Sequence, residues 1–313
     1  MKEIKKILID ITKFGFRQFE NELKTRKYIL DLLKKSRIEF KIQNFYVELP
    51  KYEKYFLIID KKKVKCYPST LSSGYIKDKT KLHNSLVDFE NLVDEPNINF
   101  NPLCKDISLP TIYKSPALSI GSKDVIKLLN AKRVLGYVKT KRARVKVPNI
   151  IVGNLHNPKN IIFTHYDSLF KGAIDNASGV AICLYLLKNN KFILANNLFV
   201  FSGNEELSYK RPIYWGFGYR MFEKEYLEVL RKAEKILVVD SVGHTAPKLI
   251  KDQKIIELGL PLKNLKKLNN VYMISGDIKK LMDVYHSDLD NIKLIKDKFL
   301  YETYRALLKV VYP

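Results

Sequence analysis

Hydrophobic positions along the chain repeat first with the period of a helix and later as short apolar runs separated by helical stretches. Residues 3–36 carry isoleucine, leucine and phenylalanine at helical spacing, and residues 40–47 alternate as in a strand. From residue 150 onward, apolar strand-like runs alternate with helical segments up to a terminal helix over 299–311. This alternation favours an α/β fold, and we predict a three-layer sandwich with a mostly parallel, mixed central sheet.

The segment 49–136 differs from the rest of the chain in its pattern of hydrophobic and polar residues. Short β-like pieces are separated there by proline, asparagine and lysine. We therefore predict that residues 1–48 and 137–313 form one domain, which is interrupted by a small β-rich module over 49–136.

The chain of 313 residues is strongly basic, with 56 Lys and Arg against 33 Asp and Glu and a formal net charge of +23. Such a charge can attract nucleic acid or an anionic membrane surface. The lysines are scattered along the whole length, however, and no zinc-finger, KH or RRM signature is visible. We do not expect nucleic acid as the main partner.

The cysteines and the N-terminus indicate the compartment. The three cysteines are odd in number and form no CxxC motif, as in a reduced intracellular protein. The N-terminus lacks the apolar core of a signal peptide, and no window approaches the ~20 apolar residues of a membrane span. We predict a cytoplasmic protein without a membrane partner; the oligomeric state stays open, a homo-oligomer included.

Polar residues that directly follow apolar strands are the candidates for chemistry, because ligands of α/β sheets gather at the carboxyl ends of the strands. His165 and Asp167 end one run, Glu205 and Glu206 the next, and Asp240 a third. Two further candidates, in GAIDNASG and in YHSDLD, are Asp175 and His286.

This inventory of imidazole and carboxylate, without cysteine, suits zinc or a neighbouring transition ion. The ligands suffice for two ions that share one bridge, and Asp175, between Gly172 and Gly179, is suited to bridging. Because the neighbours Glu205 and Glu206 diverge from a strand end, one can ligate while the other acts as a general base.

The ordered motifs THYDS, GAIDNASG, GNEE, VVDSVG and YHSDLD resemble those of the co-catalytic two-zinc aminopeptidases of peptidase clan MH, such as bacterial leucyl aminopeptidase and aminopeptidase Y. The N-terminal segment from FGFRQF resembles the opening helix and strand of that family. The module over 49–136 is similar in position to the protease-associated module of some members. The resemblance implies a zinc exopeptidase fold and removal of the N-terminal residue from a peptide substrate.

The resemblance also implies a role for each candidate. Two zinc ions would be bridged by Asp175, with His165 and Asp240 on one ion and Glu206 and His286 on the other. Asp167 would hold the His165 imidazole, and Glu205 would be the general base. Two departures from the family pattern are Lys171, where a proline is usual, and SYKRPIYWGFGYR after the glutamate pair, which leaves substrate specificity open.

Other interpretations of the same residues remain open. A single-zinc enzyme similar to glutaminyl cyclases shares most of the ligands, and a carboxypeptidase of the same clan is a third option. A basic binding protein with an inactive site is the alternative outside enzymes. Each candidate residue also has a purely structural interpretation. His165 on its own could be a hydrogen-bonded residue at a strand end, and Asp175 could be a helix cap. Glu205 and Glu206 could form a solvated acidic turn.

Overall fold

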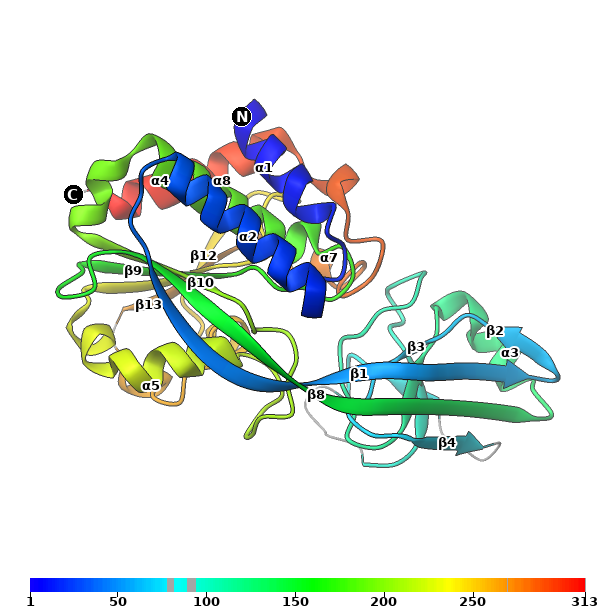
Figure 1. The fold of residues 1–313 in the computed structure, drawn as a ribbon. Helices are drawn as coiled ribbons and strands as arrows, with labels where there is room; N and C mark the ends of the chain where they lie inside the picture. Colours follow the sequence, from blue (N-terminus) through cyan, green and yellow to red (C-terminus); the bar gives the residue numbers. More distant parts are fainter. Residues whose placement is uncertain (78–81, 89–93, 269, 313) are drawn as a thin grey trace. The chain divides into compact units, whose positions relative to one another are not determined.

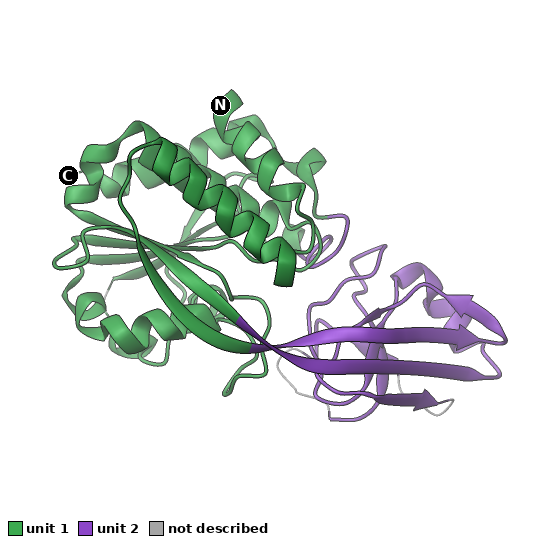
Figure 2. Ribbon diagram, in the orientation of Figure 1, with its two compact units in different colours: residues 1–47, 146–281, 290–313 green, residues 48–145, 282–289 purple. Residues whose placement is uncertain are grey.

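A computed structural model describes residues 1–77, 82–88, 94–268 and 270–312. The chain divides into two compact units, which Figure 2 shows in different colours. Unit 1 consists of Met1–Val47, Lys146–Leu281 and Asp290–Pro313, and unit 2 of Glu48–Val145 and Met282–Leu289.

The sheet of unit 1 is mixed, with a parallel centre. Neighbouring strands β10 and β9, β9 and β11, and β11 and β13 run parallel, whereas β8 and β12 flank them in antiparallel pairing. The prediction of a mixed sheet with a parallel centre is confirmed. The strands in spatial order are β12 (Lys248–Ile250), β13 (Val271–Ser275), β11 (Lys235–Val239), β9 (Asn160–His165), β10 (Asn197–Ser202), β8 (Val134–Gly153) and β1 (Lys41–Ile59).

Helices cover both faces of this sheet, as Figure 1 shows, so that three layers result. One face carries α1 (Lys2–Thr12), α2 (Phe19–Lys35), α4 (Ser178–Asn189) and α8 (Asp297–Val311). The other carries α5 (Phe217–Lys232) and α6 (Gln253–Gly259). The helix α1 buries Ile4, Ile7, Leu8 and Ile11 on one stripe, the pattern of a surface helix that faces a core.

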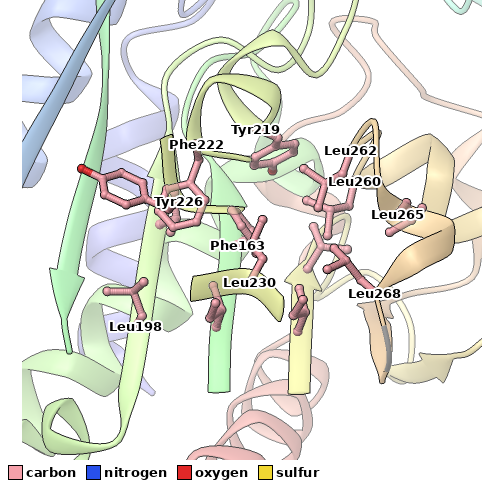
Figure 3. Close-up of a cluster of buried hydrophobic side chains, with 14 of the residues drawn as sticks. Phe163, Leu198, Tyr219, Phe222, Tyr226, Leu230, Leu260, Leu262, Leu265 and Leu268 are labelled. Atoms are coloured by element: carbon pink, nitrogen blue, oxygen red, sulfur yellow. The ribbon is translucent and has the colours of Figure 1, made fainter. Parts of the chain in front are cut away.

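The layer between the sheet and α5 is a cluster of large apolar side chains (Figure 3). Phe163 of β9 meets Tyr219 and Phe222 of α5 edge-on, with ring centroids 5.5 and 5.3 Å apart. Every residue of β9 and β10 is buried, because helices lie on both sides of these strands. This core fixes the ends of the strands that carry the candidate residues.

The helical region over 3–36 consists of two helices with a turn between them. Gly15 lies in the turn at a φ of +64°, a conformation that favours glycine and ends the helical path. The turn brings Arg17 into the interior, where its side chain is fully buried.

Unit 2 has a hydrophobic core of its own, and strands surround this core. One sheet runs β3 (Tyr67–Pro68), β7 (Ala117–Ser119), β6 (Asn97–Phe100), β5 (Leu82–Asn84). The distal parts of β1 and β8 pair with β2 (Lys62–Val64) and β4 (Gly74–Lys77). The core residues are Leu57, Ile59, Val64, Ile76, Ile98, Leu118, Ile120 and Val138, with the short helix α3 (Val125–Leu129) packed nearby.

Unit 2 also includes Met282–Leu289, a stretch that the sequence analysis assigned to the other domain. This stretch joins it through a bridge between Ser108 and Ser287. The predicted identity of 49–136 as a protease-associated-like module stays a prediction. Among the helices of the described ranges, none combines the length and the apolar character needed to cross a membrane.

We expect Phe163→Ala to lower the free energy of unfolding of unit 1 by about 3–5 kcal/mol, since the truncation leaves a cavity among packed rings. Trp215, the only tryptophan of the chain, lies in unit 1 and reports its unfolding in urea by fluorescence. The matched control is Phe192→Ala, at a ring that is 61% exposed, for which we expect a loss of no more than about 1 kcal/mol. Equal losses for the two variants would contradict the assignment of this core.

Candidate metal centre

The candidate residues of unit 1 follow directly from three adjacent parallel strands. His165 is the last residue of β9 and stands opposite Ser202, the last residue of β10. Glu205 and Glu206 come shortly after Ser202, and Asp240 comes directly after β11. Since the carboxyl ends of parallel strands share one edge of the sheet, these side chains meet there, and all of them are buried.

The imidazole of His165 lies between several carboxylates. Its Nε2 is 3.1 Å from Asp175 Oδ1 and 3.6 Å from Asp240 Oδ1. Its Nδ1 lies 3.2 Å from the backbone oxygen of Asp167, and a ring N–H there leaves the lone pair on Nε2. Burial alone lowers the pKa of His165, but the charge of Asp240 and the contacts with Asp167 and Asp175 outweigh it and hold this pKa well above its usual value.

Asp175 lies in a tight segment, Ala173–Ala177, that the rest of unit 1 fastens. The carboxylate of Asp290 accepts hydrogen bonds from the backbone N–H groups of Ile174 and Asp175, at 2.7 and 3.1 Å. The Asn176 side chain donates to Thr164 Oγ1 and to the backbone oxygen of Val239, at 3.0 and 2.9 Å. The segment is thus tied to both β9 and β11, and the Asp175–Asn176 peptide is cis.

Close packing of α4 against the sheet requires a glycine at position 179, in the DNASG sequence. A Cβ on Gly179 would lie 2.8 Å from the backbone oxygen of Val239, so a larger residue would push the first turn of α4 off the sheet. Close approach of α4 to the sheet keeps Asp175 beside His165.

Asp167 orients the loop that carries the glutamate pair. Its carboxylate accepts hydrogen bonds from the backbone N–H groups of Glu205, at 3.0 and 3.1 Å, and of Glu206, at 3.1 Å. Gln18 Nε2 donates to the same carboxylate at 3.0 Å. Asp167 Oδ1 also lies 3.5 Å from His165 Nδ1, so this one side chain touches both the imidazole and the glutamate loop.

The two glutamates differ in surroundings. Glu206 Oε1 accepts a hydrogen bond from the backbone of Leu169 at 3.3 Å, and ligand atoms of Glu206, His165 and Asp175 all lie within 4.8 Å of one another. Burial raises the pKa of Glu205 well above its usual value. The positive charge of His165 opposes this shift, and the negative charges of Glu206, Asp167 and Asp240 add to it. Glu205 therefore holds a proton more readily than an ordinary glutamate.

A buried arginine spans the loop between His165 and Asp175. Arg17 donates to the backbone oxygens of Tyr166, Lys171 and Gly172, at 2.8, 2.6 and 3.0 Å. Burial lowers its pKa to about 10, and the negative charges of nearby carboxylates act in the other direction. These carboxylates are Glu206, Asp167, Asp290 and Asp175.

His286 belongs to unit 2. Its Nδ1 lies 3.0 Å from the backbone oxygen of Leu109, and its ring stacks on that of Tyr285, with centroids 3.7 Å apart. An Nδ1–H bonded to a carbonyl leaves the lone pair on Nε2, the form in which histidine ligates metals. Its place in the ligand set stays a prediction.

Three residues that fasten the centre have no assigned role in the sequence analysis: Arg17, Gln18 and Asp290. Arg17 and Gln18 stand in FGFRQF, and Asp290 is the last residue of YHSDLD, so all three lie inside segments that carry the resemblance. Their contacts are largely with backbone atoms, for which the sequence holds no signal.

Fold and site together define a three-layer α/β protein with a buried centre of histidine and carboxylates at the strand ends. Solved structures with this fold include a zinc aminopeptidase, BSAP, from Bacillus subtilis, with a TM-score of 0.73 and 14% identity over 99% of this chain and 94% of that one. A Peptidase M28 precursor from Shewanella amazonensis has a TM-score of 0.71 and 13% identity over 100% and 92%. A glutaminyl cyclase from an Acidobacteriales bacterium has a TM-score of 0.57 and 12% identity over 99% and 92%.

The comparison confirms the predicted fold, and with it the resemblance to the zinc aminopeptidases at the level of fold. Neither the protein-family models nor the curated proteins give a match to this sequence.

We expect Asp290→Ala to weaken zinc binding by about 10–100-fold, since the backbone that presents Asp175 loses both hydrogen bonds. Competition with a chromogenic chelator measures the affinity, and circular dichroism checks the fold. The matched control is Asp283→Ala at an exposed carboxylate. Unchanged zinc affinity in a folded Asp290→Ala protein would refute the positioning role.

Proposed function

We propose that this protein is a zinc-dependent aminopeptidase that removes the N-terminal residue of peptides. The observation that carries the proposal is the convergence of His165 Nε2 with the carboxylates of Asp175, Asp240 and Glu206 at the edge of parallel strands. The fold shared with the zinc aminopeptidase of Bacillus subtilis supports it. We keep the cytoplasm as the proposed location.

The donor set fits a divalent metal ion. Asp175, Glu206 and Asp240 bring several buried negative charges close together, an arrangement that is costly without positive charge among them. Arg17 supplies one cation, but its guanidinium binds backbone oxygens. Imidazole nitrogen and carboxylate oxygen are ligands that zinc accepts.

We assign the ligands in the order that the motif resemblance implies. His165 and Asp240 would hold one ion, Glu206 and His286 would hold a second, and Asp175 would be shared by the two. The contacts of His165 Nε2 with Asp175 and Asp240 support the first half of this assignment. Support for His286 comes from its motif and from the 3.0 Å contact of its Nδ1 with the backbone oxygen of Leu109, which orients the ring.

When bound, zinc lowers the pKa of water and polarises a carbonyl group. In the proposed reaction Glu205 accepts a proton from the attacking water and later donates it to the leaving amine nitrogen. Burial raises the pKa of this carboxyl, and a raised pKa favours uptake of the proton in the first of these transfers. Asp167 and the N–H of Gly216, which donates to the Glu205 backbone oxygen at 2.5 Å, hold the residue in position.

A single-zinc glutaminyl cyclase activity is the second candidate, because glutaminyl cyclases also share the fold, at lower TM-scores than the Bacillus subtilis aminopeptidase and the Shewanella amazonensis peptidase. Ammonia release from peptides with N-terminal glutamine, without release of a free amino acid, would favour this candidate.

We expect Glu205→Gln to reduce kcat on aminoacyl p-nitroanilides by about 10²–10⁴-fold, because the amide cannot carry the proton. Zinc content should stay unchanged, since Glu205 is not assigned as a ligand. Glu228→Gln on the exposed face of α5 is the matched control and should keep full activity. Near-normal turnover in Glu205→Gln would show that another group is the base.

Removal of zinc with a chelator should abolish the aminopeptidase activity, and added zinc should restore it. Metal analysis of the purified protein should give two zinc ions per chain. His165→Ala should lose both activity and zinc, because Nε2 is central to the cluster. A stoichiometry of one zinc together with ammonia release would shift the assignment to a glutaminyl cyclase. Full activity after chelation would exclude a metal-dependent enzyme.

A further inference from the structure

The sheet face that packs against α5 leads from the apolar core to the candidate metal ligands. Side chains alternate between the two faces of a strand, and directly paired residues of neighbouring strands point to the same face. Phe163 is paired with Val200 on one side and with Val238 on the other, and all three belong to the core under α5. The next row on this face, two positions further along each strand, consists of His165, Ser202 and Asp240.

Tyr219 of α5 stands where these two rows meet. Its ring packs edge-on against Phe163, with centroids 5.5 Å apart, and Figure 3 shows it within the apolar cluster. The neighbouring Gly218 lets the helix approach the sheet closely, because a Cβ there would collide with Ser202 Oγ. The N–H of Gly218 also donates to the backbone oxygen of Asn204 at 2.7 Å, so this turn of α5 is fastened to the glutamate loop. Tyr219 is thus held firmly beside the strand ends.

The hydroxyl of Tyr219 has no hydrogen-bond partner among the described residues, although the side chain is completely buried. An unpaired hydroxyl in the interior is costly, and a phenylalanine at this position would avoid the cost. Burial raises the pKa of Tyr219 well above its usual value. The positive charge of His165 opposes this shift, and the charges of Asp240 and Glu205 add to it. The hydroxyl therefore keeps its proton and lies near these groups as a hydrogen-bond donor.

Asp240 is the acceptor that fits this donor best. It stands in the row directly beyond the Tyr219 ring, and its charge acts on the Tyr219 pKa more strongly than that of Glu205. Its Oδ1 accepts a hydrogen bond from Ser241 Oγ at 3.1 Å, and a carboxylate has lone pairs for further donors. Because Tyr219 is completely buried, its hydroxyl does not face a substrate that arrives from solvent, and it acts through a residue of the centre.

We propose that Tyr219 is a positioning residue of the metal centre, whose hydroxyl donates a hydrogen bond to the Asp240 carboxylate when this carboxylate ligates zinc. The inference rests on the proposed function and adds to its site a residue from SYKRPIYWGFGYR, where the sequence departs from the family pattern. Partners of this kind fix the orientation of a ligand, and their loss typically weakens metal binding by about 10–100-fold.

The test is the zinc affinity of the full-length protein, measured by competition with a chromogenic chelator. Tyr219→Phe keeps the ring that packs on Phe163 and removes only the hydroxyl. We expect this variant to bind zinc about tenfold more weakly. The visible absorption spectrum of its cobalt-substituted form should shift, since the orientation of one ligand changes. Thermal unfolding of the metal-free protein confirms that the variant is folded.

The matched control is Tyr226→Phe. Tyr226 lies on the same helix and in the same core cluster, and its hydroxyl donates to Glu225. This control should keep both the zinc affinity and the cobalt spectrum of the unchanged protein. A second comparison adds Tyr219→Phe to Asp240→Ala. Because Tyr219 acts through Asp240, the double variant should bind zinc no more weakly than Asp240→Ala alone.

Unchanged zinc affinity in a folded Tyr219→Phe protein would overturn this inference and leave the proposed function intact. An equal loss in Tyr226→Phe would overturn it too, since removal of any hydroxyl from this core would then have the same effect. A further loss in the double variant would show that Tyr219 does not act through Asp240. Absent zinc binding by the unchanged protein would refute the proposed metal centre, and this inference with it.

Discussion

The constraint on which the centre of unit 1 depends is the burial of several carboxylates at one edge of the sheet. Asp167, Asp175, Glu206 and Asp290 lie close enough to Arg17 to act on its pKa, and Asp240 acts on that of His165. Like charges in a buried site repel and are poorly solvated, so each carboxylate needs a donor or a cation. Two backbone N–H groups donate to Asp167 and two to Asp290. The charges of Asp175, Glu206 and Asp240 converge near His165 Nε2, where a metal ion would balance them.

Much of this arrangement can be predicted from the sequence. The apolar runs that end at His165, Ser202 and Val239 become parallel strands with almost every residue buried, because helices cover both faces of the sheet. A polar residue that directly follows such a strand has its position fixed by the strand end. His165 and Asp240 were therefore predictable as neighbours, although 75 positions separate them in the chain.

The residues that hold the centre together were not predictable in the same way. Arg17 binds carbonyl oxygens about 150 residues away, and Asp290 binds amide groups about 115 residues away. Nearly every residue type has the same backbone groups, so the identity of the residue whose backbone is bound does not indicate that the contact forms. The domain boundaries were likewise hard to define, because β1 and β8 continue from one unit into the other without a break in their strand pattern.

The segment around Asp175 is held by hydrogen bonds with both Arg17 and Asp290, and this has a consequence for folding during synthesis. One contact, from Arg17, comes from a residue synthesised about 155 residues before the segment, and the other, from Asp290, comes from a residue synthesised about 115 residues after it. During translation the segment between His165 and Asp175 is held from one side only. A nascent chain that has not yet reached Asp290 lacks the second contact, so ordered presentation of Asp175 waits until that residue has left the ribosome.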